Sequence, residues 1–199
     1  MTLGEGASGK NGGMVGPSLH KLGLDGLTGI YGKDKAIDIL QEGMTAISYF
    51  QEFIEAEKID CDLKMTGRLR GVTNQKALDS VLRDSEKLTA LNGFKFDVVE
   101  RENIRGEIGS DIYQGGVIYH QDGGLHPHKL VLSLAQKVMD LGGTIHQKTQ
   151  VGDISKTPAG FHVETDKGSL DVGNVVIASN GYTKKFLIFI NGFFPSRQR

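Results

Sequence analysis

Glycines near the start of the chain have the spacing of a nucleotide-binding turn. The stretch GEGASG is a literal G-x-G-x-x-G with glycines at Gly4, Gly6 and Gly9. Such a turn binds pyrophosphate when a buried strand leads into it and a helix starts at its last glycine. Only three residues precede Gly4, and the eight residues after Gly9 include three glycines and a proline, which make a poor helix start. Although Asp25 lies where a ribose-binding acid is expected, we predict that this stretch is not the dinucleotide fingerprint.

Three histidines raise the question of a metal site. His120, His126 and His128 lie close together in the sequence, but they flank a glycine pair and a proline, whereas zinc needs several converging ligands. His126 directly precedes Pro127, at a helix start where backbone N–H groups need acceptors. We therefore predict no metal site and a structural or site-adjacent role for His126.

Other reactive side chains give weaker signals. Arg68 and Arg70 lie on a predicted strand, where they face either an anionic group or solvent, and solvent is the favoured interpretation. Cys61 is the only cysteine, and we interpret it as a packing residue. No catalytic residue can be named from the sequence.

Composition places wide bounds on the class of protein. The chain has 199 residues, 38% of them hydrophobic, and a net charge of −1, which is typical of a soluble chain of one domain or two small ones. The near-zero charge argues against nucleic acid or a membrane surface as a partner. With one cysteine, no recognisable signal peptide, and a longest apolar run confined to residues 186–190, we expect a cytoplasmic protein that does not span a membrane.

Hydrophobic periodicity predicts alternating helices and strands, and hence an α/β fold. Helices are expected over residues 33–58 and 75–91, over a short polar segment at 101–108, and from Pro127 to the glycine pair at 142–143. Strands are expected over residues 63–73, 96–100, 115–120, 144–147, 151–156, 160–165 and 169–172. The last predicted strand, residues 175–178, is the fully apolar sequence VVIA, which is typical of a strand buried in a parallel sheet.

Three segments, taken in order, resemble a known family. They are GASGKNGG at 6–13, GGLHPHKL at 123–130 and VVIASNGYT at 175–183. Together they resemble the flavin-dependent amine oxidoreductases of the D-amino-acid oxidase superfamily, which includes glycine and sarcosine oxidases. The resemblance covers about residues 5–183 and points to the gamma-glutamylputrescine oxidoreductase branch. That branch usually has arginine where this chain has Lys10, and threonine where it has Ser179.

The resemblance implies FAD as the cofactor. The glycines of the first segment let backbone N–H groups approach the flavin without an intervening side chain, although a flexible glycine-rich tail is the alternative interpretation. The last segment would contact FAD after its strand, although any strand followed by an Asn-Gly turn looks the same. The implied FAD-lining residues are Ala7, Ser8, Gly9, Asn11, Gly12, Gly13, Ala178, Ser179, Asn180 and Gly181, together with Val151, whose backbone would face the adenine.

The resemblance also implies an incomplete FAD-binding Rossmann-like domain, interleaved with part of an antiparallel substrate domain. Residues 1–61 and 120–183 are assigned to the FAD-binding part, 62–119 to the substrate part, and 184–199 to a divergent tail. Family members carry a strand, a true fingerprint turn and a helix ahead of the glycine segment, so we expect a truncated chain that binds FAD weakly or not at all. Residues 175–178 would then form an unpaired sheet edge that favours self-association.

Two functions remain open. The resemblance implies part of an FAD-dependent enzyme that oxidises the C–N bond of a small primary or secondary amine or amino acid by hydride transfer to flavin. Chain length favours the alternative, a non-catalytic α/β module that retains no cofactor and acts, if at all, as a binding partner.

Overall fold

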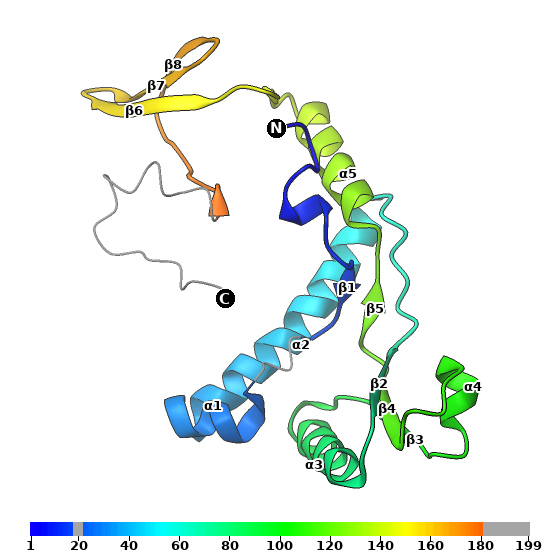
Figure 1. The fold of residues 1–199 in the computed structure, drawn as a ribbon. Helices are drawn as coiled ribbons and strands as arrows, with labels where there is room; N and C mark the ends of the chain where they lie inside the picture. The colour runs from blue at the N-terminus through cyan, green and yellow to red at the C-terminus, as the bar shows by residue number, and fades with distance from the viewer. Residues whose placement is uncertain (18–21, 181–199) are drawn as a thin grey trace. The chain divides into compact units, whose positions relative to one another are not determined.

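The computed structural model describes residues 1–17 and 22–180 (Figure 1). These residues form a mixed α/β fold, as predicted, and every pair of strands in the described part is antiparallel. The chain divides into two compact units. The larger unit is Leu3–Ile145, and the smaller unit combines Met1–Thr2 with His146–Arg199.

The larger unit contains two consecutive helices in its first half. Helix α1 is Gly23–Tyr31, and after Gly32, whose φ is +82°, helix α2 runs over Lys33–Ala56. The long helix was predicted over 33–58 from the helical spacing of its apolar residues. The structure confirms it, and Leu40 and Ile47 are buried on one face. No helix in the described part of the chain is long and apolar enough to cross a membrane.

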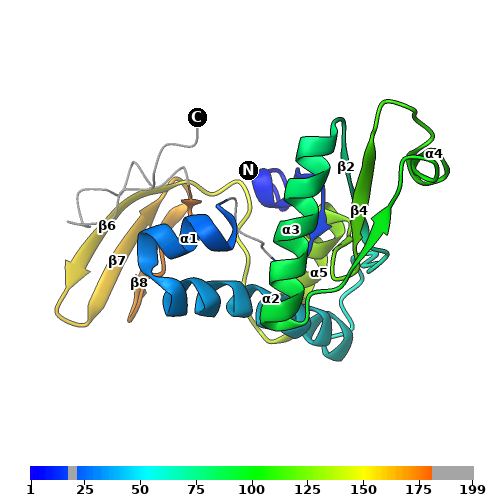
Figure 2. The same ribbon diagram turned by 90° about the horizontal axis from the view of Figure 1, so that it is seen from below.

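A three-stranded antiparallel sheet lies within the range assigned to the substrate part. Strands β2 (Arg68–Val72), β4 (Gly115–Tyr119) and β3 (Phe96–Val99) are hydrogen-bonded in that order. Helix α3 (Gln75–Asn92) packs beside this sheet (Figure 2). The short helix α4 (Ile104–Ile108) occupies the last part of the segment predicted as a polar helix.

The ends of α3 follow local capping chemistry. The side chain of Asn74 accepts a hydrogen bond from the N–H of Ala77 at 2.9 Å, which satisfies one donor of the first helical turn. Gly93 ends the helix in the left-handed region, with a φ of +71°. The helix predicted over residues 75–91 is therefore confirmed, with its end one residue later, at Asn92.

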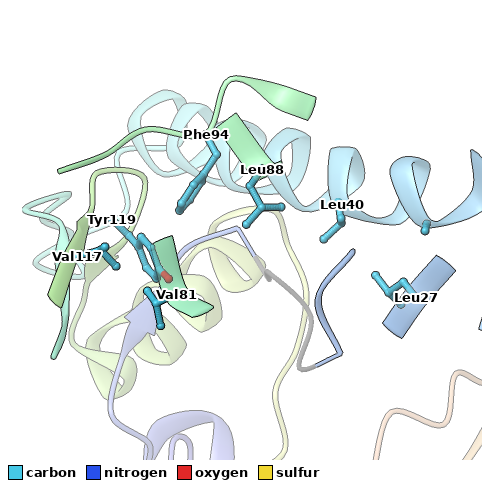
Figure 3. Close-up of a cluster of buried hydrophobic side chains, with 8 residues drawn as sticks. Leu27, Leu40, Val81, Leu88, Phe94, Val117 and Tyr119 are labelled. Carbon is cyan, nitrogen blue, oxygen red and sulfur yellow. The ribbon is translucent and has the colours of Figure 1, made fainter. Parts of the chain in front are cut away.

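The main hydrophobic core joins α1, α2 and α3 to the sheet. Phe94 and Tyr119 meet edge to face with ring centroids 5.1 Å apart (Figure 3). The buried cluster consists of Leu27, Ala36, Leu40, Val81, Leu88, Phe94, Val117 and Tyr119.

A second cluster fixes helix α5 (Pro127–Asp140). Ile54, Ile59 and the buried Cys61 form its centre, and Leu130 and Leu134 of α5 pack against them. Just before α5, strand β5 (Gly123–Gly124) pairs with strand β1 (Met14–Val15).

The smaller unit contains an antiparallel meander. Strands β6 (Val151–Thr157), β7 (Gly160–Thr165) and β8 (Gly168–Val172) pair in sequence order. The register shifts after Val151, so that Gly152 and Asp153 form a bulge in β6.

Two predicted strands are wrong. Residues 144–147 form no strand, and neither do residues 175–178, where Val176 is 88% exposed. A buried parallel strand needs hydrogen-bonded neighbours, and no described strand pairs with either segment. Self-association through residues 175–178 stays a prediction.

Candidate functional site

The glycine loop, residues 6–13, does not form a dinucleotide-binding turn. Ala7–Gly9 makes one 3-10 turn, η1, which no strand precedes and no α-helix directly follows within residues 1–17. The prediction that GEGASG is not the fingerprint is therefore confirmed.

The side chain of Asn11 holds the glycine loop in one conformation. Its Nδ2 donates to the carbonyl oxygens of Ala7 at 3.0 Å and Ser8 at 3.1 Å. Its Oδ1 accepts from the N–H of Gly13 at 2.8 Å. These three bonds close the loop on itself, so the residue implied as a cofactor contact also has a structural role.

The glycines of the loop serve two different purposes. A Cβ at Gly9 would collide with the carbonyl oxygen of Gly4, and one at Gly13, whose φ is +65°, would collide with that of Leu125. A Cβ at Gly12 would meet no described atom within 4 Å. Gly9 and Gly13 are therefore required by the fold, whereas Gly12 leaves its backbone open to approach.

Two contacts anchor the glycine loop beside the start of α5 (Figure 1). The N–H of Leu125 donates to the carbonyl oxygen of Gly13 at 2.9 Å, and the ring of His128 lies directly against Gly4. The N–H groups of Asn11 and Gly12 have no acceptor in the part of the chain that the structure describes. They are the donors that an approaching anion or flavin ring can use.

The three neighbouring histidines do not converge. His120 Nε2 lies 2.8 Å from Asp97 Oδ2, and His128 packs on Gly4. His126 caps α5, where its Nδ1 accepts from the N–H of Lys129 at 3.4 Å, so its predicted structural role is confirmed. Among residues 1–17 and 22–180, no three side chains that could bind a metal ion come together.

Cys61 is a packing residue, as predicted. It is 1% exposed and lies in the second hydrophobic cluster. Burial raises the pKa of its thiol, an effect that the neighbouring carboxylates of Asp60 and Asp62 reinforce. A neutral, buried thiol is a poor nucleophile.

The two arginines of β2 have partners that the sequence did not indicate. The Nε of Arg68 donates to Asp122 Oδ2, and its guanidinium carbon lies 5.5 Å from the ring centroid of Tyr119. Arg70 Nη1 donates to the hydroxyl oxygen of Tyr119 at 3.2 Å. Asp122 is the residue that sequence reasoning missed, because an acid ahead of two glycines is typical of an ordinary turn.

In the smaller unit, Val151 lines a cavity of about 310 Å³. Val163 and Leu170 give this cavity apolar walls, and Lys167 lies on its border. Val151 is half-buried at the start of β6, opposite Thr165.

The last implied contacts follow an irregular segment of the smaller unit. Ala178 is exposed, Ser179 is half-buried, and Asn180 has a φ of +44°, in the left-handed region. Gly181 lies outside the described residues. Since the glycine loop belongs to the larger unit, a joint FAD site for all the implied residues stays a prediction.

Comparison with known proteins identifies relatives along almost the whole chain. A family model described as FAD dependent oxidoreductase (DAO) matches residues 2–196. Two relatives are a probable oxidoreductase, OrdL, of Haemophilus influenzae and gamma-glutamylputrescine oxidoreductase of Escherichia coli, each 29% identical over 90% of this chain. This chain spans only 42% of the length of either relative.

Solved structures share the fold. Glycine oxidase from Geobacillus kaustophilus aligns with 89% of this chain at a TM-score of 0.66 and 23% identity, and the match covers 46% of that protein. NikD, an unusual amino acid oxidase, aligns with 89% of this chain at a TM-score of 0.63 and 15% identity, covering 42% of that protein.

Proposed function

The chain belongs to the FAD dependent oxidoreductase (DAO) family, and from this premise we propose that its glycine loop contacts FAD through the backbone. The observation that carries the proposal is the contrast within the loop. Gly9 and Gly13 are blocked by neighbouring carbonyl groups, while Gly12 faces open space. Free N–H groups beside a missing side chain suit the phosphate, ribityl or ring oxygens of a flavin nucleotide.

The cavity at Val151 supports a role for the smaller unit in the same binding. Its apolar walls suit a flat heteroaromatic ring, and the bulge after Val151 frees backbone groups from the regular ladder. We propose that this cavity receives the adenine of FAD. Residues 178–181 are proposed as further contacts, on the resemblance alone.

We further propose that the complete enzyme oxidises the C–N bond of a small primary or secondary amine or amino acid. When bound, FAD would supply the acceptor for a hydride from the carbon that bears the nitrogen, and water would hydrolyse the imine formed from the amine. The names of the relatives, a gamma-glutamylputrescine oxidoreductase and a glycine oxidase, support this class of substrate.

The parts of this chain then take separate roles in the proposal. Residues 1–61 and 120–183 contribute to FAD binding, and residues 62–119, which include the antiparallel sheet, form part of the substrate layer. The chain covers less than half of its relatives, and we propose that it binds FAD weakly and is inactive alone. A cytoplasmic location remains our proposal, since it rests on composition.

A fluorescence titration of FAD with the 199-residue chain tests the binding proposal. We expect saturable quenching that Gly12→Asp weakens, because a carboxylate in that open space repels the phosphates of FAD. Gly29→Asp is the matched control, since that glycine also has no described atom near a Cβ and lies in α1. Equal affinity of the two variants contradicts a role for the glycine loop.

Anaerobic addition of amines and amino acids tests the proposed oxidation of the C–N bond. It uses an FAD-loaded form of the protein that is extended to the length of its relatives. Loss of the visible absorbance of oxidised flavin with one class of amine is the expected result. FAD binding without reduction by any amine or amino acid contradicts the proposed reaction and favours the non-catalytic alternative.

A further inference from the structure

Asp122 is a buried carboxylate with an unusual set of neighbours. It is 4% exposed and is one of two buried polar residues in the described part of the chain. Its Oδ2 accepts from Arg68 Nε, whereas its Oδ1 has no hydrogen-bond partner among the described residues. Burial raises the pKa of this carboxyl group, against the opposing effect of the Arg68 guanidinium.

Three segments of the larger unit meet at Asp122. Its carbonyl oxygen accepts from the N–H of Gly67 at 2.9 Å, at the entry to β2. Its own N–H donates to Tyr119 at the end of β4, at 3.4 Å. Its Oδ1 lies directly against Gly16, where a Cβ would collide with the carboxyl group. Gly16 directly follows β1, the strand through which the chain leaves the glycine loop.

An ordinary turn aspartate would be exposed and would cost little to replace. Asp122 is instead desolvated and only partly paired, which opposes folding. The ion pair with Arg68 offsets only part of this desolvation cost, because 43% of the Arg68 side chain is exposed and solvent screens its charge. Such an arrangement persists in a fold when its geometry is needed.

We propose that Asp122, held by Arg68, is a positioning residue that fixes Gly16, and with it the segment in which the chain leaves the glycine loop through β1, against the sheet formed by β2, β4 and β3. The importance of this contact for FAD rests on the function proposed above. The Asp122 carboxylate fills the space beside Gly16. Its ion pair with Arg68 joins it to β2. This contact thereby keeps the glycine loop and the sheet formed by β2, β4 and β3 in a fixed position relative to one another.

Amide hydrogen exchange of the 199-residue chain, measured by mass spectrometry without FAD, tests the contact itself. We expect Asp122→Asn and Arg68→Met to speed exchange of peptides within residues 3–17 by about tenfold, the effect of one lost charged hydrogen bond. Exchange in α3 is expected to stay unchanged. Arg68→Lys, which keeps the positive charge, is expected to give a smaller increase.

Asp111→Asn is the matched control, because it removes an arginine–aspartate pair in which both side chains are exposed and which lies outside the glycine loop and its neighbours. It should leave residues 3–17 unaffected. Unchanged exchange of residues 3–17 in both test variants overturns the proposal. An equal increase over α3 and the glycine loop also overturns it, since that pattern means general destabilisation.

An FAD titration of the same variants separates this inference from the proposed function. Faster loop exchange together with weaker FAD binding supports both. Faster loop exchange in the variants, together with no FAD binding by the wild-type chain, supports the positioning contact and contradicts the proposed function. If the wild-type chain binds FAD but Asp122→Asn and Arg68→Met leave the loop exchange unchanged, the result contradicts the positioning role and leaves the proposed function standing.

Discussion

Two neighbouring glycines of the glycine loop have different roles, which their surroundings reveal. Gly13 has a φ of +65° and is pressed against the carbonyl oxygen of Leu125, while Gly12 has open space on its side-chain face. The sequence GKNGG presents both as equivalent, and only the structure distinguishes a glycine that the fold requires from one that leaves access for a ligand.

This contrast predicts different effects of the same substitution at the two positions. We expect Gly13→Ala to lower the free energy of unfolding of the larger unit by about 1–3 kcal/mol, through left-handed strain and displacement of Leu125. Gly12→Ala should change it by less than about 0.5 kcal/mol. Urea unfolding followed by circular dichroism measures both, and equal losses contradict the assignment of separate roles.

At the residue scale, the sequence predicted the structural role of His126 and the packing role of Cys61, because both follow from local rules. It could not predict Asp122. The carboxyl group is buried by Gly16 and Arg68, which are 106 and 54 positions away in the chain. Such a contact depends on how distant segments come together.

At the scale of elements, strong periodicity made α2, α3 and α5 predictable, and the side chains of Asn74 and His126 cap the starts of α3 and α5. Helix α1 was missed because three of its nine residues are glycine, which lowers helix propensity, although Leu27 is fully buried in the core. The wrong strand at residues 175–178 has the opposite cause. Its apolar residues favour a strand, but no described neighbour supplies hydrogen bonds.

Capping at the start of α3 gives an element-scale prediction. Asn74→Ala removes the acceptor for the Ala77 N–H and should lower the free energy of unfolding by about 1 kcal/mol. His126→Ala at the start of α5 should cost less, because its bond to the Lys129 N–H is longer, at 3.4 Å. Chemical denaturation of both variants tests the order, and a larger loss for His126→Ala contradicts it.

The meander of the smaller unit carries a pH-dependent pair between its last two strands. His162 Nδ1 lies 2.7 Å from Asp171 Oδ1, and this hydrogen bond raises the pKa of His162 above its ordinary value of 6.5. Because the folded state favours protonated His162, the pair stabilises the meander fully at a pH below 6.5, the ordinary pKa of the ring. The stabilisation is lost as the pH rises through the raised pKa.

Asp171→Asn should therefore lower the pKa of His162 toward its ordinary value and reduce the loss of stability with rising pH. Titration of the His162 ring by NMR measures the first effect, and urea unfolding at several pH values measures the second. Asp166→Asn is the matched control, because the Asp166 carboxylate accepts from the N–H of Gln150 and belongs to the same unit. Identical titration of wild type and Asp171→Asn contradicts the importance of the pair.

At the scale of the whole molecule, three short motifs carried more information than the elements between them. Their order predicted the family that the match over residues 2–196 supports. The resemblance implied one FAD site for the glycine loop, Val151 and residues 178–180, which belong to different compact units. Their joint role in binding FAD stays a proposal.

Chemical-shift mapping with FAD tests that joint role most directly, since NMR detects weak binding in a chain of 21.6 kDa. We predict saturable shifts of the amides of Ala7, Ser8, Asn11, Gly12 and Val151, with residues of α3 and α4 unaffected. Gly12→Asp should weaken the response of every shifted amide together. Saturable binding of FAD that leaves the glycine loop unshifted, or no shift at any FAD concentration, would contradict the assignment of this loop as a flavin contact.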